Sequence, residues 1–134
     1  VHICYSFART PGLIGIGSYT GNGSADGPMV VVDDGASGFK PAWIMFKNIS
    51  QAGYGWSVFD VARDTIGNPS STALAVNNST SNSSVASYKH DVLANGFKIR
   101  GNSGETNYSG NRIIYLAFAE NPFGGSGIAQ AKAR

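Results

Sequence analysis

The chain has few of the residues that most metal sites and catalytic sites require. Its 134 residues include one cysteine, Cys4, and two histidines, His2 and His90. A single thiol excludes an intrachain disulfide and a thiolate zinc cluster. The histidines form neither an H-x-H nor an H-E-x-x-H pattern, so we expect each to be an ordinary exposed or hydrogen-bonded side chain. We expect no metal and no cofactor.

Charge is also scarce. Charged residues make up 13% of the chain, about half the usual share, and the net charge is +2. The Lys and Arg residues form no basic stripe, which nucleic-acid binding usually needs. Apolar runs such as residues 29–32 and 42–46 fall far short of the roughly 20 residues of a membrane span. We expect neither nucleic-acid binding nor membrane insertion.

Helical periodicity is nearly absent, whereas short apolar segments separated by glycine and asparagine turns are frequent. The expected strands are residues 2–9, 14–20, 28–33, 41–48, 55–61, 72–77, 84–88, 96–100 and 112–119. Many short strands at this spacing predict an all-β fold, an antiparallel β-sandwich or jelly roll. We expect a single domain over residues 1–123 and a flexible tail over residues 124–134.

Two expected strands, residues 43–47 and 112–118, are apolar at nearly every position. Such runs are typical of central strands that are covered on both faces. We therefore expect an aromatic core built from these strands and their neighbours. Its expected members are Trp43, Trp56, Phe97, Tyr115 and Phe118.

The two ends of the chain are similar in sequence. Residues 3–11 align with residues 114–122 without a gap. The residues that recur are Ile3, Phe7, Ala8 and Pro11, which return as Ile114, Phe118, Ala119 and Pro122. A period this long corresponds to a whole domain. One interpretation is that residues 1–9 are the closing strand of an upstream copy; the other is chance similarity between two apolar strands.

Candidate catalytic groups are few. A polysaccharide depolymerase needs two carboxyl groups held close together, and Asp60, Asp64 and Glu120 are the acids considered for that role. No pattern in the sequence pairs them, and an ion pair between Asp60 and Arg63 that fixes a turn is the favoured alternative. The run at residues 33–35, Asp-Asp-Gly, could supply oxygens to calcium, but it is also an ordinary turn signal, which we favour. We expect no catalytic residues.

The aromatic residues Tyr54, Trp56 and Tyr108, with Tyr88, could form a platform for sugar rings. Tyr54 and Tyr108 lie between glycines or polar residues, as loop-tip side chains do. The alternative is that these rings cover the core or contact another protein. Glycan binding therefore stays a second hypothesis, with Tyr54, Trp56 and Tyr108 as its candidate residues.

Five blocks of sequence carry a resemblance to a known family. They are residues 17–28, 38–47, 56–63, 95–100 and 115–123. Together they resemble a repeated β-domain of uncharacterised function that is found in tail-fibre and other virion-surface proteins of tailed bacteriophages. The resemblance extends over about residues 2–123, and its first block is the most specific. Residues 12–16 and 29–35 depart from the usual pattern, so the loop shape there is expected to differ.

The resemblance implies a role and a location. It implies a non-enzymatic structural protein of the phage virion, displayed on the particle surface as a tail-fibre tip or a capsid decoration. Its partners would be identical copies, by analogy in a homotrimer, and other capsid or tail proteins. The alternative function is a carbohydrate-binding module for a host-surface glycan. The family has no established catalytic residues, and none is transferred to this chain.

Overall fold

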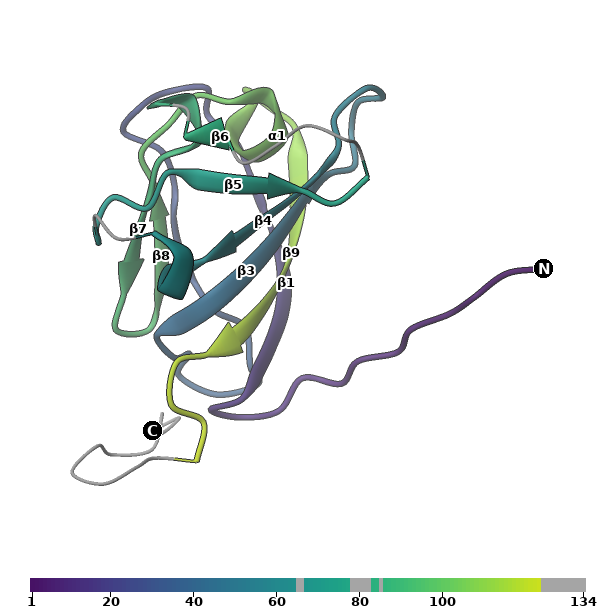
Figure 1. Ribbon diagram of the computed structural model, residues 1–134, viewed down its shortest axis with the longest axis vertical. Coiled ribbons are helices and arrows are strands. Elements are labelled where there is room, and N and C mark those ends of the chain that lie inside the picture. Colours follow the sequence, from purple (N-terminus) through teal and green to yellow (C-terminus); the bar gives the residue numbers. More distant parts are fainter. Residues whose placement is uncertain (65–66, 78–82, 85, 124–134) are drawn as a thin grey trace.

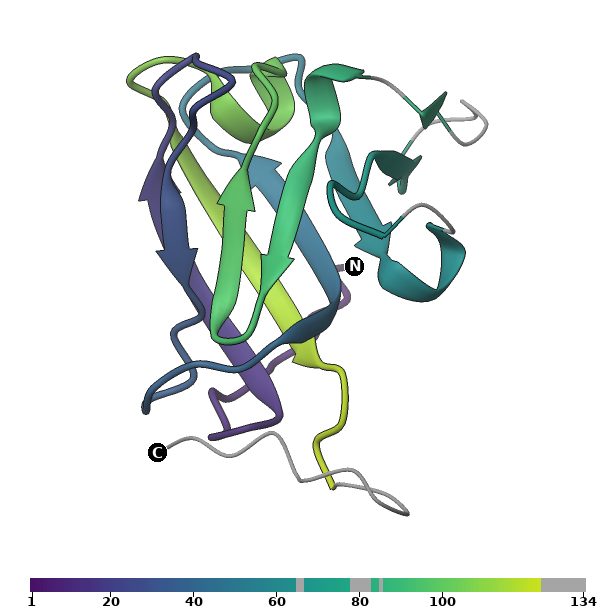
Figure 2. The same ribbon diagram turned by 90° about the vertical axis from the view of Figure 1, so that its left-hand side faces the viewer.

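Two antiparallel β-sheets lie face to face in the computed structural model, which describes residues 1–64, 67–77, 83–84 and 86–123 (Figures 1 and 2). In spatial order, the larger sheet contains β1 (Ile14–Thr20), β9 (Arg112–Ala119), β3 (Pro41–Asn48), β4 (Trp56–Asp60), β5 (Thr72–Ala75) and β6 (Ser83–Ser84). The smaller sheet contains β2 (Met29–Val31), β8 (Gly96–Ile99) and β7 (His90–Leu93). The expected all-β antiparallel sandwich is confirmed.

The short helical segments lie in connections. They are the 3-10 turns Val61–Arg63 and Ala86–Tyr88 and the single α-turn α1, Gly104–Asn107. Asp60 caps the first of these, because its Oδ1 accepts a hydrogen bond from the backbone N–H of Ala62 at 3.0 Å. No ion pair between Asp60 and Arg63 is present among the described residues, so the expected pairing is replaced by this cap.

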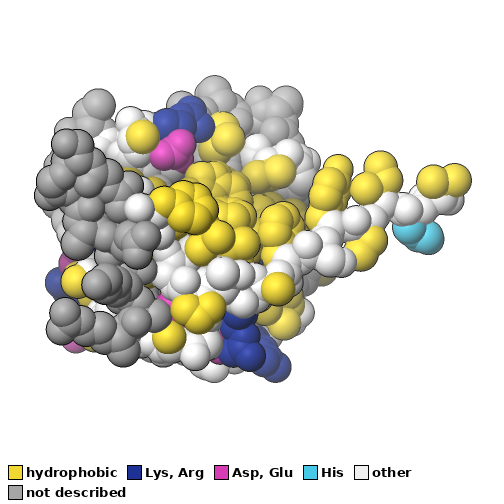
Figure 3. All heavy atoms as spheres, turned by 90° about the horizontal axis from the view of Figure 1, so that it is seen from below, with side chains coloured by type: hydrophobic (Ala, Val, Ile, Leu, Met, Phe, Trp, Pro, Cys, Tyr) yellow, Lys and Arg dark blue, Asp and Glu magenta, His cyan; other side chains and the backbone are white. Residues whose placement is uncertain are grey.

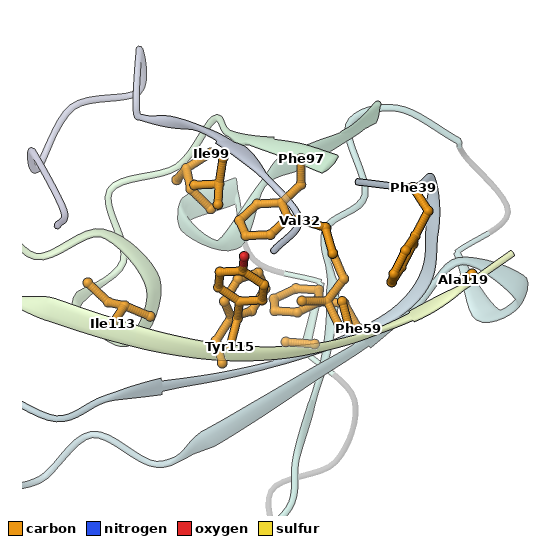
Figure 4. Close-up of a cluster of buried hydrophobic side chains, with 13 residues drawn as sticks. Val32, Phe39, Phe59, Phe97, Ile99, Ile113, Tyr115 and Ala119 are labelled. Carbon is orange, nitrogen blue, oxygen red and sulfur yellow. The ribbon is translucent and has the colours of Figure 1, made fainter. Parts of the chain in front are cut away.

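The core lies between the two sheets and is rich in aromatic rings (Figure 4). Phe46 of β3 is 1% exposed and makes edge-to-face contacts with Phe59 at 5.6 Å and Phe97 at 5.2 Å between ring centroids. Tyr115 of β9 extends from the larger sheet to the smaller one, where its hydroxyl accepts a hydrogen bond from the backbone N–H of Asp33 at 2.8 Å. These contacts fix the spacing of the sheets and leave the opposite face of the larger sheet outward.

Three of the five expected core aromatics do not belong to this core. Phe97 and Tyr115 are buried as expected, at 0% and 3% exposure. Trp43, Trp56 and Phe118 are only half-buried and lie on the outward face of the larger sheet. Strand side chains alternate between faces, and the second sheet covers only one of them. The expectation that β3 and β9 are covered on both faces was therefore wrong for the described residues.

Strand positions also differ in two places. Residues 2–9 form no strand and leave the body as an extended arm (Figure 1). Residues 84–88, expected as a strand, contain the end of β6 and a 3-10 turn, and the strand β7 begins later, at His90. A two-residue turn, Ala94 and Asn95, joins β7 to β8, since Leu93 pairs with Gly96. The expected tail, residues 124–134, lies outside the described residues.

Candidate functional site

The outward face of the larger sheet carries an apolar groove, which we call the outer groove. Strand register aligns its side chains in rows: Trp43 of β3 lies opposite Phe118 of β9, and Met45 lies opposite Leu116. On the other side of β9, Leu116 lies opposite Ile16 of β1. The groove has a volume of about 730 Å³. Trp56 and Ile114 also contribute to its lining.

Aromatic contacts organise one end of the outer groove. The rings of Trp43 and Phe118 are tilted against each other with centroids 5.4 Å apart. Phe7 packs its edge on Phe118 at 6.2 Å. Seen from below relative to Figure 1, hydrophobic side chains gather on the body and continue along the arm (Figure 3). In the described part of the chain, only Tyr5 and Phe7 of the arm reach over this face.

The base of the arm is anchored to the body by polar contacts, whereas the backbone of the arm is not. Arg9 forms an ion pair with Asp33 at 2.7 Å, and Thr10 begins a turn whose carbonyl accepts a hydrogen bond from the N–H of Ile14 at 2.9 Å. Within the described chain, no backbone hydrogen bond joins residues 1–9 to a strand. The arm therefore leaves the sandwich from a fixed point with its backbone groups exposed.

The candidate glycan residues are divided between two places. Tyr54 and Tyr108 lie together, with ring centroids 6.1 Å apart and planes at 45°. Trp56 lines the outer groove, which neither tyrosine lines. Tyr54 is held over Gly104, where an added Cβ would lie only 2.3 Å from the ring. Tyr108 is 45% exposed, so part of the pair is accessible from outside.

The candidate acids each have a local structural partner. Asp60 caps a 3-10 turn. Asp64 accepts hydrogen bonds through Oδ2 from the hydroxyl of Ser70 at 2.9 Å and from the N–H of Ser71 at 2.5 Å. Glu120 forms an ion pair with Lys40 at 2.9 Å. Each of the three carboxylates is thus engaged in a contact that holds a turn, a loop or a strand end.

The pair Asp33 and Asp34 forms a turn anchor. Asp34 is fully buried, and its carboxylate accepts hydrogen bonds from the backbone N–H groups of Gly12 at 2.9 Å, Ala36 at 2.9 Å and Gly38 at 3.1 Å. Burial acts to raise the pKa of this carboxyl, but the backbone donors outweigh it and the pKa is lowered. Among the described residues, no group of three or more His, Cys, Asp or Glu side chains is placed to hold a metal ion.

His90 is a residue whose environment the sequence did not reveal. It was expected to be exposed or hydrogen-bonded beside a loop, but it is 1% exposed on β7. Its ring lies 4.6 Å from Phe59 and 6.0 Å from Phe46 between centroids, and its Nδ1 has no hydrogen-bond partner. Burial lowers the pKa of His90 from 6.5 to about 4. The alternation of His90 and Val92 before the turn was the available signal for this strand.

Asn107 is a second residue of this kind. It is fully buried, and its Nδ2 donates hydrogen bonds to the carbonyls of Ser24 at 2.7 Å and Gly101 at 2.8 Å. Its Oδ1 accepts a hydrogen bond from the N–H of Asn22 at 2.9 Å. One side chain thus ties α1 to the glycine-rich loop after β1.

No helix in the described residues is long and apolar enough to cross a membrane. No curated protein and no solved structure gives a significant match to this chain. One family matches over residues 1–122, a range that includes the arm, both sheets and the outer groove. The chain therefore belongs to the family described as Domain of unknown function (DUF7483).

Proposed function

We propose that this chain is a non-enzymatic structural module of a tailed-phage particle that assembles with identical copies on the particle surface. The resemblance of its sequence blocks to virion-surface β-domains supports the location, as a tail-fibre tip or a capsid decoration. Other capsid or tail proteins would be its further partners. The observation that carries the assembly is the outer groove.

The physical argument rests on the strands that form the groove. β3 and β9 are central in the larger sheet, yet their outward residues Trp43, Met45, Leu116 and Phe118 form an open apolar surface. Removing such surface from water contributes about 25 cal/mol per Å² of favourable free energy, which is partly offset by the entropy lost on association. Large contiguous apolar patches on a protein surface mark interaction sites. The continuous apolar sequences of β3 and β9 predict that both faces of these strands are covered. A second protein surface on the outer groove would supply the covering that is missing from the outward face.

The scarcity of charge favours the same interpretation. Exposed charges on a face oppose its burial, because each must be desolvated or paired. The outward side chains of β9 from Ile114 to Phe118 are all apolar. By analogy with fibres and capsid-decorating proteins, we propose a homotrimer.

Light scattering coupled to size exclusion tests the assembly. One chain has a mass of 14.0 kDa, and the proposal predicts a species of three times that mass. A dimer would retain the assembly and contradict the three-fold symmetry. A species of one-chain mass at every concentration would contradict the assembly itself.

A carbohydrate-binding module is the second candidate, and the contact between Tyr54 and Tyr108 is the observation that favours it. Aromatic rings stack on the apolar faces of sugars, and ligand binding raises the melting temperature through linkage. A glycan array followed by thermal shift tests this function. Binding that disappears in Tyr108→Ala but persists in Trp56→Phe would support a site at the tyrosine pair. No binding on the array and no thermal shift would remove this candidate.

A further inference from the structure

The arm carries an apolar stripe of its own. Ile3 is 80% exposed, Tyr5 79% and Phe7 51%. They alternate with the smaller residues Cys4, Ser6 and Ala8. In an extended chain, alternate side chains point to opposite sides. The arm therefore presents three large apolar side chains on one side and small ones on the other.

The same chain thus exposes two apolar surfaces, the arm stripe and the outer groove, and they meet at Phe7. Phe7 contacts Phe118 at the end of the groove, and Tyr5 also borders the groove. The N-terminal end of the arm points away from the body (Figures 1 and 3). Ile3 and Tyr5, at 80% and 79% exposure, are largely uncovered by their own chain.

We propose that the arm of one copy leaves its own groove and occupies the outer groove of a second copy, with Ile3, Tyr5 and Phe7 facing that groove. Phe7 then exchanges its contact with Phe118 of its own chain for the same contact with Phe118 of the second copy, as in a domain swap. This inference rests on the proposed function, since it names the surface through which identical copies assemble. Each copy supplies one arm and one groove. The exchange therefore closes either as a reciprocal pair or as a ring in which each arm reaches the next copy.

The area involved is adequate for a stable assembly. Side chains of this size bury about 150–250 Å² each, so the exposed parts of Ile3, Tyr5 and Phe7 amount to about 400 Å² per arm. In a reciprocal pair the two arms together bury about 800 Å². The smaller area that the two grooves lose adds to this and brings the interface to about 1,000 Å², the lower end for a specific contact.

The docked arm leaves Cys4 on its outward side, because Cys4 alternates with Ile3 and Tyr5. Cys4 is the single thiol of the chain, and Trp43 and Trp56, the two tryptophans, both line the outer groove. A nitroxide attached to Cys4 quenches tryptophan fluorescence at short range. The natural sequence thus provides a probe on the arm and a reporter in the groove.

The experiment mixes two forms of the chain. The first carries the nitroxide on Cys4 and the substitutions Trp43→Phe and Trp56→Phe, so that it has no tryptophan. The second carries Cys4→Ser and keeps both tryptophans. Quenching in the mixture can then arise only between copies. We expect the fluorescence of the second form to fall by about half as the first is added, and to recover when excess unlabelled first form is added.

Two controls separate docking from random collision. The first control is a tryptophan-free chain with Cys4→Ser and Asn102→Cys, which carries the nitroxide at an exposed position outside the arm. We expect it to quench the tryptophan fluorescence of the second form much less than the label on Cys4 does. The double variant Ile3→Ser and Tyr5→Ser removes the tip of the stripe from side chains that are about 80% exposed, so the body should still fold. We expect it to lose quenching and assembly, whereas His2→Ser, on the opposite side of the arm, should keep both.

The outcomes separate this inference from the proposed function. If Ile3→Ser with Tyr5→Ser assembles like the unmodified chain and no quenching occurs between copies, the arm inference is overturned and the assembly proposal stands. A third form carries the nitroxide on Cys4 and keeps both tryptophans, so that it reports quenching within one copy. If its fluorescence is quenched equally at all dilutions and no quenching occurs in the mixture, the arm closes on its own groove and the inference is overturned. If the unmodified chain has one-chain mass at every concentration, both are overturned.

Discussion

Buried His90 should make the stability of this protein depend on pH between pH 8 and pH 5. The ring lies among Phe46 and Phe59, where a charged imidazolium is poorly solvated. A hydrogen bond with the backbone of Tyr88 and the carboxylates of Asp64 and Asp91 favour the charged form, but burial outweighs them and lowers the pKa to about 4. In the unfolded chain the same side chain titrates at about 6.5.

The direction and size of the effect follow from linkage. Above pH 6.5 His90 is neutral in both states and contributes no pH dependence. As the pH falls below 6.5, the unfolded chain binds a proton that the folded chain does not, so the free energy of unfolding decreases until the pH reaches about 4. With a folded pKa of about 4, the loss is about 2 kcal/mol at pH 5 and about 3 kcal/mol at full effect.

Urea unfolding at pH 8, 7, 6 and 5 measures this dependence. We expect the midpoint to fall by about 1 M between pH 8 and pH 5. His90→Gln cannot titrate and should abolish most of the slope, whereas His2→Gln changes the exposed histidine and should leave the slope intact. A slope that is unchanged by His90→Gln would refute the reasoning.

Two further predictions concern buried polar anchors. Asp34→Ala leaves buried backbone N–H groups without a partner and should lower the free energy of unfolding by about 3 kcal/mol. Asp33→Ala, which removes an exposed ion pair, should lower it by less than about 1 kcal/mol. Equal effects of the two substitutions in urea unfolding would contradict the role of Asp34 as an anchor. Because the folded pKa of Asp34 is lowered, its contribution is present at neutral pH and should be lost only as the pH falls through that lowered pKa. Asn107→Ala should lower the free energy of unfolding by about 3 kcal/mol. Asn102→Ala, at an exposed position, should leave it nearly unchanged in the same assay. An Asn107→Ala variant as stable as the unmodified chain would show that the glycine-rich loop after β1 does not depend on this side chain.

Hydrophobic patterning was sufficient to predict the fold class and its principal strands. β1, β3 and β9 have the bounds expected from their apolar runs, and alternation placed Phe97 inward. β7 was missed because it contains His90 and Asp91, which lower its apparent strand character, although its pairing with β8 across a two-residue turn is regular. The local pattern identifies strands that are made of apolar residues. It misses a strand such as β7, whose polar residues become buried only when the strand pairs with β8 and packs on the core.

The candidate site could not be located from the sequence, because a continuous apolar strand does not reveal what covers each of its faces. Trp43 and Phe118 were assigned to the core on the same grounds as Tyr115, because all three lie in continuous apolar runs. Only the position of the second sheet separates them from Tyr115. The arm was likewise expected to be a strand, because its alternation suits one, but no strand of the described chain pairs with it. The outward face of the larger sheet and the unpaired arm are both surfaces that a partner would cover in the proposed assembly.

The central claim is that identical copies assemble through the outer groove, and the solution mass of a matched pair of variants tests it most directly. Met45→Glu places a charge in the groove on an outward side chain, and Thr20→Glu places the same charge on the same face of the sheet outside the groove. Light scattering should give an assembled mass for the unmodified chain and Thr20→Glu, and 14.0 kDa for Met45→Glu. An assembled mass for Met45→Glu equal to that of the other two would contradict the account.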